Sequence, residues 1–363
     1  MTNETPLSTT RPKKSAMREW IEAIFLAIIA AIIIRTFFFE AYTIPTSSME
    51  KSLLVGDYLF VSKINYGARL PMTPLAFPFA HNKMPFTNDL KSYSERIKLP
   101  YFRFPGFQNI ERNDVVVFNF PLDIENPVDK RENYIKRCVG LPGDQFQIID
   151  RQIVVNEQKQ NFPKEGQFEY FVNTKDSHLS QDQIATLNIT DGGPIQSDTG
   201  YVGKYALTSE TLQKIKALPN VISVEEIQRP KGLSLIEEPV FPEDPRHYPW
   251  NLDNYGPLPI PAAGQTVTLD TANIAIYRDL IEQYEGNEIK QIGTDFTING
   301  VATNQYTFKM NYYFMMGDNR HNSLDSRFWG FVPENHIVGK AILIFFSKED
   351  VNTRWERMFK WVE

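Results

Sequence analysis

An apolar run near the N-terminus constrains this chain more than any other feature. Residues 20–39 read WIEAIFLAIIAAIIIRTFFF, and the stretch from Ala23 to Ile34 is unbroken. A helix needs about 20 apolar residues to cross a bilayer, and the aromatic residues at both ends of the run suit the two membrane interfaces. We therefore expect a transmembrane helix at residues 19–39, preceded by a polar tail at residues 1–18.

Two other readings of the run are a cleaved signal peptide and the buried helix of a soluble protein. Cleavage is disfavoured because the bulky Phe39 stands where a small residue is needed. Basic residues precede the run, and acidic residues follow it closely. The positive-inside rule then predicts a cytoplasmic N-terminus and an outward-facing remainder of the chain. The basic residues are Arg11, Lys13, Lys14 and Arg18.

The remainder is typical of a mainly β fold. The segments DYLFVSKI from Asp57 and DVVVFNF from Asp114 are rich in aromatic and β-branched residues, which favour strands. QFQIID and QIVVNE flank Arg151 and predict one hairpin. A second is predicted around Asn299-Gly300, between FTI and the alternating segment YTFKMNYYF. One face of that segment would carry Tyr306, Phe308, Met310, Tyr312 and Phe314.

The pattern divides the outward part into a β-rich core with an insertion. We expect residues 40–157 and 296–363 to form the core, and residues 158–295 to form an α+β insertion. Helices are expected in the insertion near residues 210–218 and 271–285. Residues 67–110, rich in proline and aromatic residues, predict a long irregular loop, whose rings could pack internally or touch lipid headgroups.

Composition excludes several classes of function. A net charge of −6 offers no basic excess for nucleic acid. Cys138 is the only cysteine, which excludes an intrachain disulfide and a multi-cysteine zinc site. Five scattered histidines show no ligand spacing, and there is no glycine-rich phosphate loop. We therefore expect neither a metal nor a cofactor.

Three polar clusters remain as candidates for chemistry. They are IPTSSME from Ile44, YIKR from Tyr134, and GDNRHNSLDSR from Gly317. Taken singly, each has a plain reading as a turn, a solvated strand pair or a polar loop. Their shared occurrence in one chain is what calls for another explanation.

Together the clusters resemble the ordered motifs of bacterial type I signal peptidases. TIPTSSME, DVVVFNFP, YIKRCVGLPGD and MGDNRHNSLDSRFWGFVP follow a membrane span in the family's order. The resemblance covers residues 20–66, 111–157 and 296–346. It implies a signal-peptidase-type β-rich fold and a serine endopeptidase of the inner membrane. Such an enzyme removes signal peptides from exported preproteins on the periplasmic face.

The resemblance also implies site residues. It places the nucleophile on Ser48 and the general base on Lys136, with Ser323 and Asp325 as a supporting polar pair. A lysine can act as a base only when neutral, and its ordinary pKa is about 10.4. Burial lowers that value, so Lys136 needs a dry site.

The neighbouring polar residues are expected to support this pair. Ser323 could orient the amine of Lys136 by a neutral hydrogen bond, and the Ser48 N–H with the Thr46 hydroxyl would form an oxyanion hole. Arg137, on the opposite side of its strand, could pair with Asp318 or Asp325. Arg327 could share Asp325.

Two other nucleophiles stay open. Ser47 is one, because the family often has glycine at this position, and Lys51 also departs from the family's proline. Cys138, close to two basic residues, is the other, although its position on the strand suggests a small buried residue instead. Ser48 is preferred because Met49 is in register with the motif.

The substrate is expected to add as an extended strand beside Ile44-Pro45 and Tyr134-Ile135. The family resemblance implies small residues at positions −1 and −3, with Ile44, Met49, Leu53 and Ile135 as pocket walls or, equally, as ordinary core. Expected partners are the signal peptides of exported preproteins, the lipid bilayer and the translocation machinery. Two alternatives are a self-cleaving repressor-type protease and a membrane-anchored interaction module with a vestigial dyad.

Overall fold

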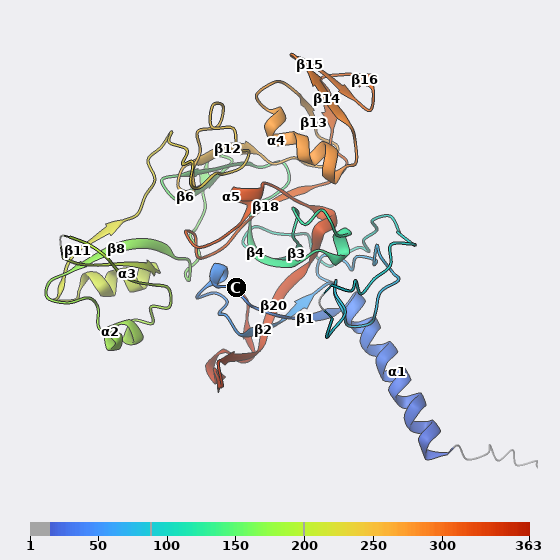
Figure 1. Ribbon diagram of the computed structural model, residues 1–363, viewed down its shortest axis with the longest axis horizontal. Helices are drawn as coiled ribbons and strands as arrows, with labels where there is room; N and C mark the ends of the chain where they lie inside the picture. Colours follow the sequence, from blue (N-terminus) through green and yellow to red (C-terminus); the bar gives the residue numbers. More distant parts are fainter. Residues whose placement is uncertain (1–14, 88, 199) are drawn as a thin grey trace, which may run out of the picture.

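One long helix precedes all the other elements. The computed structural model describes residues 15–87, 89–198 and 200–363, so three of the basic residues used above, Arg11, Lys13 and Lys14, lie outside the described residues. Helix α1 (Ala16–Phe37) begins after Ser15, whose side chain accepts a hydrogen bond from the Arg18 N–H. The helix extends away from the body, and none of its residues is buried (Figure 1). By length and composition it could cross a membrane.

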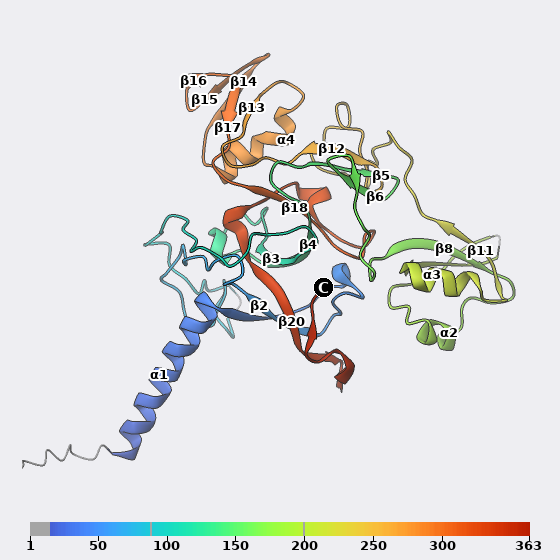
Figure 2. The same cartoon turned by 180° about the vertical axis from the view of Figure 1, so that it is seen from behind.

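A nine-stranded antiparallel sheet forms the centre of the molecule, and it confirms the expected mainly β fold. Its longest strand, β20 (Ile337–Glu349), pairs with strands on both sides and runs through the middle of the sheet (Figure 2). Two short strands, β21 (Asn352–Thr353) and β22 (Lys360–Trp361), also pair with it. Apart from β21 and β22, the strands of the sheet lie in the order β1 (Phe39–Thr43), β2 (Asp57–Ser62), β20, β3 (Val115–Asn119), β4 (Asn133–Gly140), β18 (Tyr312–Met316) and β19 (Val332–Pro333).

A second sheet contains the first expected hairpin. Strands β5 (Gln145–Ile149) and β6 (Gln152–Val155) pair around Asp150 and Arg151, both of which have positive φ. Strand β12 (Tyr255–Pro259) flanks β5, and β7 (Gln158–Lys159) flanks β6. The hairpin prediction is therefore confirmed.

A separate lobe, residues 168–226, projects from one side of the body (Figure 1). We call it the lateral lobe. Its sheet packs against α3 through Tyr170, Val172, Tyr205, Leu212 and Ile215, which all belong to one buried cluster. The elements are β11 (Val221–Glu226), β8 (Phe168–Thr174), β10 (Tyr201–Leu207) and β9 (Gly192–Ile195), in sheet order, with α2 (Gln181–Thr186) and α3 (Ser209–Lys216).

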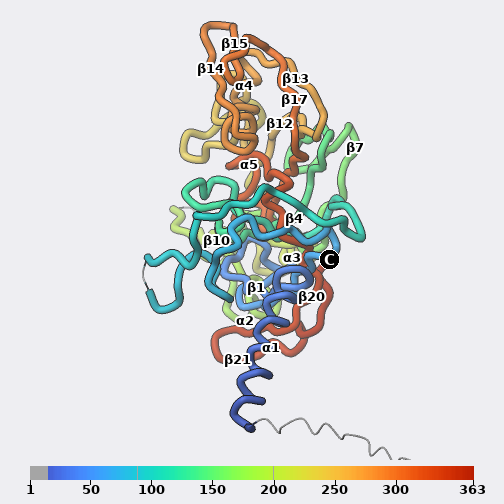
Figure 3. The backbone as a smooth tube through the Cα atoms, turned by 90° about the vertical axis from the view of Figure 1, so that its right-hand side faces the viewer, coloured from blue at the N-terminus to red at the C-terminus, as the bar shows by residue number. Residues whose placement is uncertain are grey.

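Another lobe lies at the opposite end of the molecule from α1 (Figure 3). Its helix α4 continues as a π-helical turn and ends before Gly286, whose φ is +68°. The helix expected near residues 271–285 is thus present. The elements are α4 (Ile274–Asp279), the π turn (Leu280–Tyr284), β13 (Thr266–Thr268) with β17 (Gln305–Thr307), and β14 (Ile289–Ile292), β15 (Asp295–Ile298) and β16 (Val301–Ala302).

The second expected hairpin is only partly right. Asn299 and Gly300 do form the turn, but β15 pairs with β14 and the two-residue β16. The expected single strand YTFKMNYYF is wrong, because it is divided into β17 and β18. The Glu285 carboxylate accepts the Lys309 and Met310 N–H groups, at 2.9 and 3.2 Å, which removes them from any ladder.

The segment between β2 and β3 is irregular, as expected. Its described residues form isolated bridges, such as Arg69 with Arg103, and no strand or helix. Several of its aromatic side chains are exposed, among them Phe77, Phe79 and Phe86. The segment lies beside the C-terminal end of α1 (Figure 1).

Candidate active site

Ser48 lies in a short 3₁₀ turn, Ser47–Met49, that follows the first strand of the large sheet. The chain reaches this turn along the edge of β2, since the Ile44 N–H donates to the Asp57 carbonyl at 2.9 Å. The Leu53 N–H then donates to the Met49 carbonyl at 2.7 Å. Because Met49 is fully buried, the turn is anchored in the core with the Ser48 side chain beside it.

Lys136 lies on β4, 88 residues further along the chain, and its Nζ donates to the Ser48 Oγ at 2.6 Å. Both residues are buried, with 4% and 7% of their surfaces exposed. The register pairs Lys136 with Val116 on β3, which fixes its position along the sheet. The amine also lies 5.6 Å from the centre of the Tyr134 ring.

Burial lowers the pKa of Lys136 to about 8, because an ammonium is poorly stabilised away from water. The carboxylates of Asp325 and Asp318 oppose this change, and Arg327 adds to it. A lysine with this pKa is partly neutral close to neutral pH. It can therefore accept a proton from a hydroxyl that already lies within hydrogen-bond distance.

The neighbouring serine occupies a different environment. The Ser47 Oγ accepts a hydrogen bond from the Asn322 side-chain amide at 3.3 Å, and among the described residues the hydroxyl that accepts from Lys136 is that of Ser48. Thr46, just before the turn, is exposed, and its side chain makes no capping hydrogen bond. The geometry therefore favours Ser48 over Ser47 as the residue next to a base.

Arg137 points away from Lys136 and binds Asp318 with both ends of its guanidinium group. The two nitrogen to oxygen distances are 2.8 and 2.6 Å, and both side chains are buried. The Ser52 hydroxyl donates to the same carboxylate at 2.5 Å. Removing one partner of a buried pair like this typically costs about 3 to 5 kcal/mol. The pair joins β4, the Ser48 segment and the end of β18.

Asp325 organises the loop that follows β18. It is the N-cap of α5 (Ser326–Trp329), binds the Arg327 guanidinium at 2.8 and 2.9 Å, and accepts the Gly317 N–H at 3.1 Å. The Cβ of any other residue at position 317 would lie 2.5 Å from the Ser48 carbonyl oxygen. The loop can therefore approach the Ser47–Met49 turn only with glycine there.

Ser323 lies against Gly317 on the inner side of this loop. Its hydroxyl is buried and has no hydrogen-bond partner among the described residues, although it contributes weakly to the lowered pKa of Asp325. The hydrogen bond expected from Ser323 to Lys136 is not formed in this structure. Ser323 and the Ser48 carbonyl both lie against Gly317. A role for the Ser323 hydroxyl in orienting the Lys136 amine therefore stays a prediction.

Three residues that the sequence analysis did not single out also hold the Ser47–Met49 turn. The Asn319 N–H donates to the Ser48 carbonyl at 3.1 Å, and the Asn319 side chain donates to the Ser47 carbonyl at 3.3 Å. Both Asn319 and Asn322 donate to Asp191 of the lateral lobe, at 2.7 and 2.8 Å. The motif around Gly317 signalled the two asparagines, whereas no local pattern signalled Asp191.

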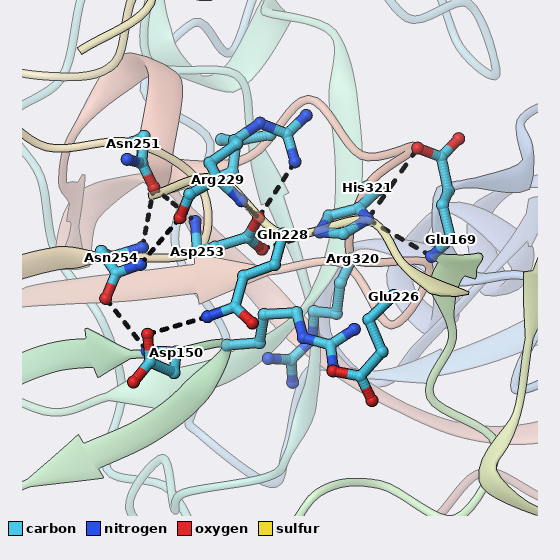
Figure 4. Close-up of polar contacts among 12 residues, drawn as sticks. Asp150, Glu169, Glu226, Gln228, Arg229, Asn251, Asp253, Asn254, Arg320 and His321 are labelled. Carbon is cyan, nitrogen blue, oxygen red and sulfur yellow. Dashed lines mark hydrogen bonds and ion pairs between the residues drawn. The ribbon is translucent and has the colours of Figure 1, made fainter. Parts of the chain in front are cut away.

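A buried polar network lies behind the same loop (Figure 4). The His321 Nε2 lies 2.7 Å from Asp253, and its Nδ1 accepts the Glu169 N–H at 3.3 Å. That pattern assigns the proton to Nε2. Arg229 bridges Asp253 and Glu238. The network ties the loop to the start of the lateral lobe and to residues 229–254.

The six residues expected to bind substrate lie around the turn and β4. Ile44, Met49 and Leu53 are buried in one cluster, against which Ile135 is partly buried. Pro45 is exposed, and the Tyr134 ring stacks on Phe120 at 4.4 Å. The same apolar cluster can serve as core and as the floor of a shallow pocket, so the binding role stays a prediction.

Cys138 does not compete with this site. It is fully buried, and burial raises the pKa of its thiol, so a nucleophilic thiolate is disfavoured. The expectation of a small buried residue at this position is therefore confirmed.

Comparison with known proteins identifies similar chains. The family model described as signal peptidase, peptidase S26, matches residues 17–205 and 260–346, which is more than half of the chain. Signal peptidase I of Buchnera aphidicola subsp. Schizaphis graminum is 28% identical over 336 residues, covering 92% of this chain and 77% of the relative. Signal peptidase I of Aquifex aeolicus is 26% identical, covering 91% and 85%. Signal peptidase I of Rickettsia massiliae is 33% identical over 156 residues, covering 43% and 49%.

Proposed function

This chain belongs to the signal peptidase family, peptidase S26, and from that premise we propose that it removes N-terminal signal peptides from exported preproteins. The observation that carries the proposal is the 2.6 Å contact between the Lys136 amine and the Ser48 hydroxyl in a buried setting. The relatives named signal peptidase I support the substrate class.

The proposed reaction uses Ser48 as nucleophile and neutral Lys136 as general base. Lys136 takes the proton from the Ser48 hydroxyl as the oxygen attacks the scissile carbonyl. When the tetrahedral intermediate collapses, the C–N bond breaks and the lysine proton passes to the leaving amine. Water, deprotonated by the same lysine, then attacks the Ser48 ester. The ester C–O bond breaks, the signal peptide leaves with a new carboxylate, and Ser48 regains its proton.

We propose that the oxyanion hole consists of the Ser48 N–H and the Thr46 hydroxyl. Thr46 is exposed at the start of the 3₁₀ turn, and its side chain makes no capping hydrogen bond. Its hydroxyl can therefore rotate toward a bound carbonyl. One lost donor of this kind typically lowers kcat by about 10² to 10³. Asp318, Arg137, Asp325 and Arg327 act in this scheme by fixing the two strands and the loop that carry the reacting groups.

Membrane anchoring belongs to the same proposal. The exposed apolar helix α1 would cross the bilayer with its N-terminus in the cytoplasm, leaving the catalytic part on the outer face. Anchoring brings the site close to signal peptides that are themselves membrane-inserted, and it allows contact with the translocation machinery. The core formed by residues 40–157 and 296–363 would then carry the chemistry, with residues 158–295 inserted into it.

The substrate would enter as an extended strand next to residues 44–45 and 134–135. The shallow apolar cluster beneath them accommodates small side chains, which fits a requirement for alanine at positions −1 and −3. Ile135 is half-buried against this cluster, and the half-buried Tyr134 ring borders the Lys136 amine.

The test of this function uses the full chain in detergent and an exported precursor with alanine at −1 and −3. We expect one cut, after the −1 residue, identified by mass spectrometry of the products. A bulky phenylalanine at −1 should block the cut, whereas phenylalanine at −2, which points away from the pockets, should be tolerated. If the folded protein leaves the precursor intact, the interaction-module alternative replaces this proposal. If it cuts only its own chain, the self-cleaving alternative does.

The lateral lobe offers a second test, because Asp191 holds both asparagines that contact the Ser47–Ser48 segment. We expect Asp191→Ala to lower kcat about tenfold with little change in KM, since a small displacement of a nucleophile is costly. Asp182→Ala, which removes an exposed carboxylate from α2 of the same lobe, should leave kcat unchanged. Equal activity of both variants and the wild type would show that the lobe does not position the nucleophile.

A further inference from the structure

A pocket of about 310 Å³ lies where α1 joins the body, away from Ser48 and Lys136. The C-terminal end of α1 supplies Ile32, Arg35 and Thr36 to its wall. The irregular segment supplies its aromatic rim, including Phe77 and Phe79, and both of these rings are about half exposed. The pocket therefore opens at the level where the proposed membrane helix would leave the bilayer.

The wall of the pocket carries an excess of positive charge. Four cationic side chains, Arg35, Lys63, Arg69 and Lys130, stand against the two carboxylates of Glu40 and Asp129. Glu40 binds both Arg35, at 2.7 Å, and Lys63, at 2.8 Å. The Asp129 carboxylate is engaged by Thr73, accepting from its N–H and its hydroxyl at 2.8 Å each.

Two of the cations make no ion pair in the part of the chain that the structure describes. Among the described residues, no carboxylate lies within ion-pair distance of Arg69 or Lys130. Arg69 donates to the Asn335 carbonyl and the Asn119 side chain, and the Lys130 amine lies 5.9 Å from the Tyr93 ring. Lys130 is only 9% exposed. The Asp129 and Glu40 carboxylates act on these cations without pairing with them directly, so they offset only part of the cost of burying the charges.

The charges act on one another across the pocket. Burial lowers the pKa of Lys130, the carboxylates of Asp129 and Glu40 oppose this change, and Arg35 and Arg69 add to it. The same two arginines oppose the effect of Glu40 on Lys63, whose pKa burial also lowers. In contrast, Lys63 and Arg35 overcome burial and hold the pKa of Glu40 at about 2. A further negative group in the pocket would relieve the repulsion among these cations.

We propose that this pocket binds the phosphate group of an anionic phospholipid from the outer leaflet. Arg69 and Lys130 would contact the phosphate oxygens, and Arg35 would share the charge from the end of α1. The exposed rings of Phe77 and Phe79 suit the glycerol and upper acyl region, where aromatic side chains favour the interface. The volume is within the range of small-ligand sites. This inference rests on the proposed membrane anchoring by α1.

The experiment is native mass spectrometry of the full chain in detergent, titrated with phosphatidylglycerol or with phosphatidylcholine. We expect one phosphatidylglycerol to be retained in preference to phosphatidylcholine. Lys130→Gln should weaken that retention about fivefold, because one basic residue near an anionic lipid surface typically raises the binding affinity by about that factor. Arg69→Gln should also weaken the retention of phosphatidylglycerol.

The matched control is Lys83→Gln, which removes a charge from the same irregular segment outside the pocket. It should retain lipid like the wild type. Equal retention of the two lipids, or equal losses in Lys83→Gln and Lys130→Gln, would overturn the proposal. Displacement of the lipid by millimolar inorganic phosphate at the same affinity would also overturn it, in favour of a free phosphate site.

The outcome is separable from the proposed peptidase activity and from anchoring. Precursor cleavage is measured on the same samples, and flotation of the full chain with phosphatidylcholine vesicles reports anchoring by α1 alone. Lys130→Gln should float and cleave in phosphatidylcholine as the wild type does. Failure of the wild type to float would remove the premise, whereas normal flotation without selective retention would reject the pocket itself.

Discussion

Ser48→Ala should lower kcat for precursor cleavage by about 10⁴-fold or more, because loss of a serine nucleophile removes the covalent route altogether. The Ser48 hydroxyl is the one that accepts the hydrogen bond from Lys136. Removing this small buried oxygen leaves the turn intact, since the turn is held by backbone contacts to Met49 and Asp57. Cleavage is followed by gel electrophoresis of the precursor with the full chain in detergent.

Ser47→Ala is the matched control. It removes a hydroxyl from the adjacent residue and forfeits one hydrogen bond from Asn322, at 3.3 Å. We expect its kcat to stay within about threefold of the wild type, as is usual when a part-exposed hydrogen bond is lost. Full activity of Ser48→Ala together with an inactive Ser47→Ala would identify Ser47, and not Ser48, as the nucleophile.

Lys136→Met should lower kcat by about 10³ to 10⁴-fold, the contribution expected of a positioned general base. Methionine has a similar length and no charge, so it fills the buried site without the desolvation that an ammonium suffers. The variant should therefore be at least as resistant to thermal unfolding as the wild type. Thermal unfolding followed by tryptophan fluorescence separates loss of catalysis from loss of fold.

Lys136→Arg discriminates between two roles of the lysine. Arginine keeps a positive charge but cannot be deprotonated at accessible pH. If Lys136 acts as a base, this variant should be as inactive as Lys136→Met. Substantial activity with arginine would mean that the site needs only a cation, and the proposed proton transfer would then be wrong.

The large sheet was predictable where local pattern and tertiary environment agree. The segments from Asp57 and Asp114 are rich in side chains that favour strands, and they form β2, which is mostly buried, and β3, which is buried throughout. The turn at Asn299-Gly300 was predictable for the same reason. The break between β17 and β18 was not, because it depends on the Glu285 carboxylate, which lies more than twenty residues earlier in the chain.

The prediction of the candidate site depended on the family resemblance more than on local sequence patterns. Nothing in the spacing of Ser48 and Lys136 indicates contact across 88 residues, and each has a plain alternative reading. The order of the motifs supplied the pairing, and the sheet register now gives its physical basis, because β4 lies next to β3 and β18. Of the two pairings expected for Arg137, the structure has the one with Asp318.

The lateral lobe was the least predictable part. Asp191 reaches Asn319 and Asn322, and Lys51, a departure from the family motif, donates to the Asn188 carbonyl of the same lobe. Such contacts join segments far apart in sequence and leave no local periodicity. The family model leaves residues 206–259 unmatched, and these include α3 and β11. This part of the chain therefore carries features outside the family pattern.

The most direct test of a neutral lysine base is the pH dependence of kcat/KM for precursor cleavage by the full chain. The pKa of Lys136 is lowered to about 8, so below that pH the amine is protonated and cannot accept the proton of Ser48. We predict that kcat/KM rises with pH, reaches half of its maximum near pH 8, and then levels off. A rate that is flat between pH 6 and 9, or one that falls as the pH rises, would contradict the assignment of Lys136 as the base.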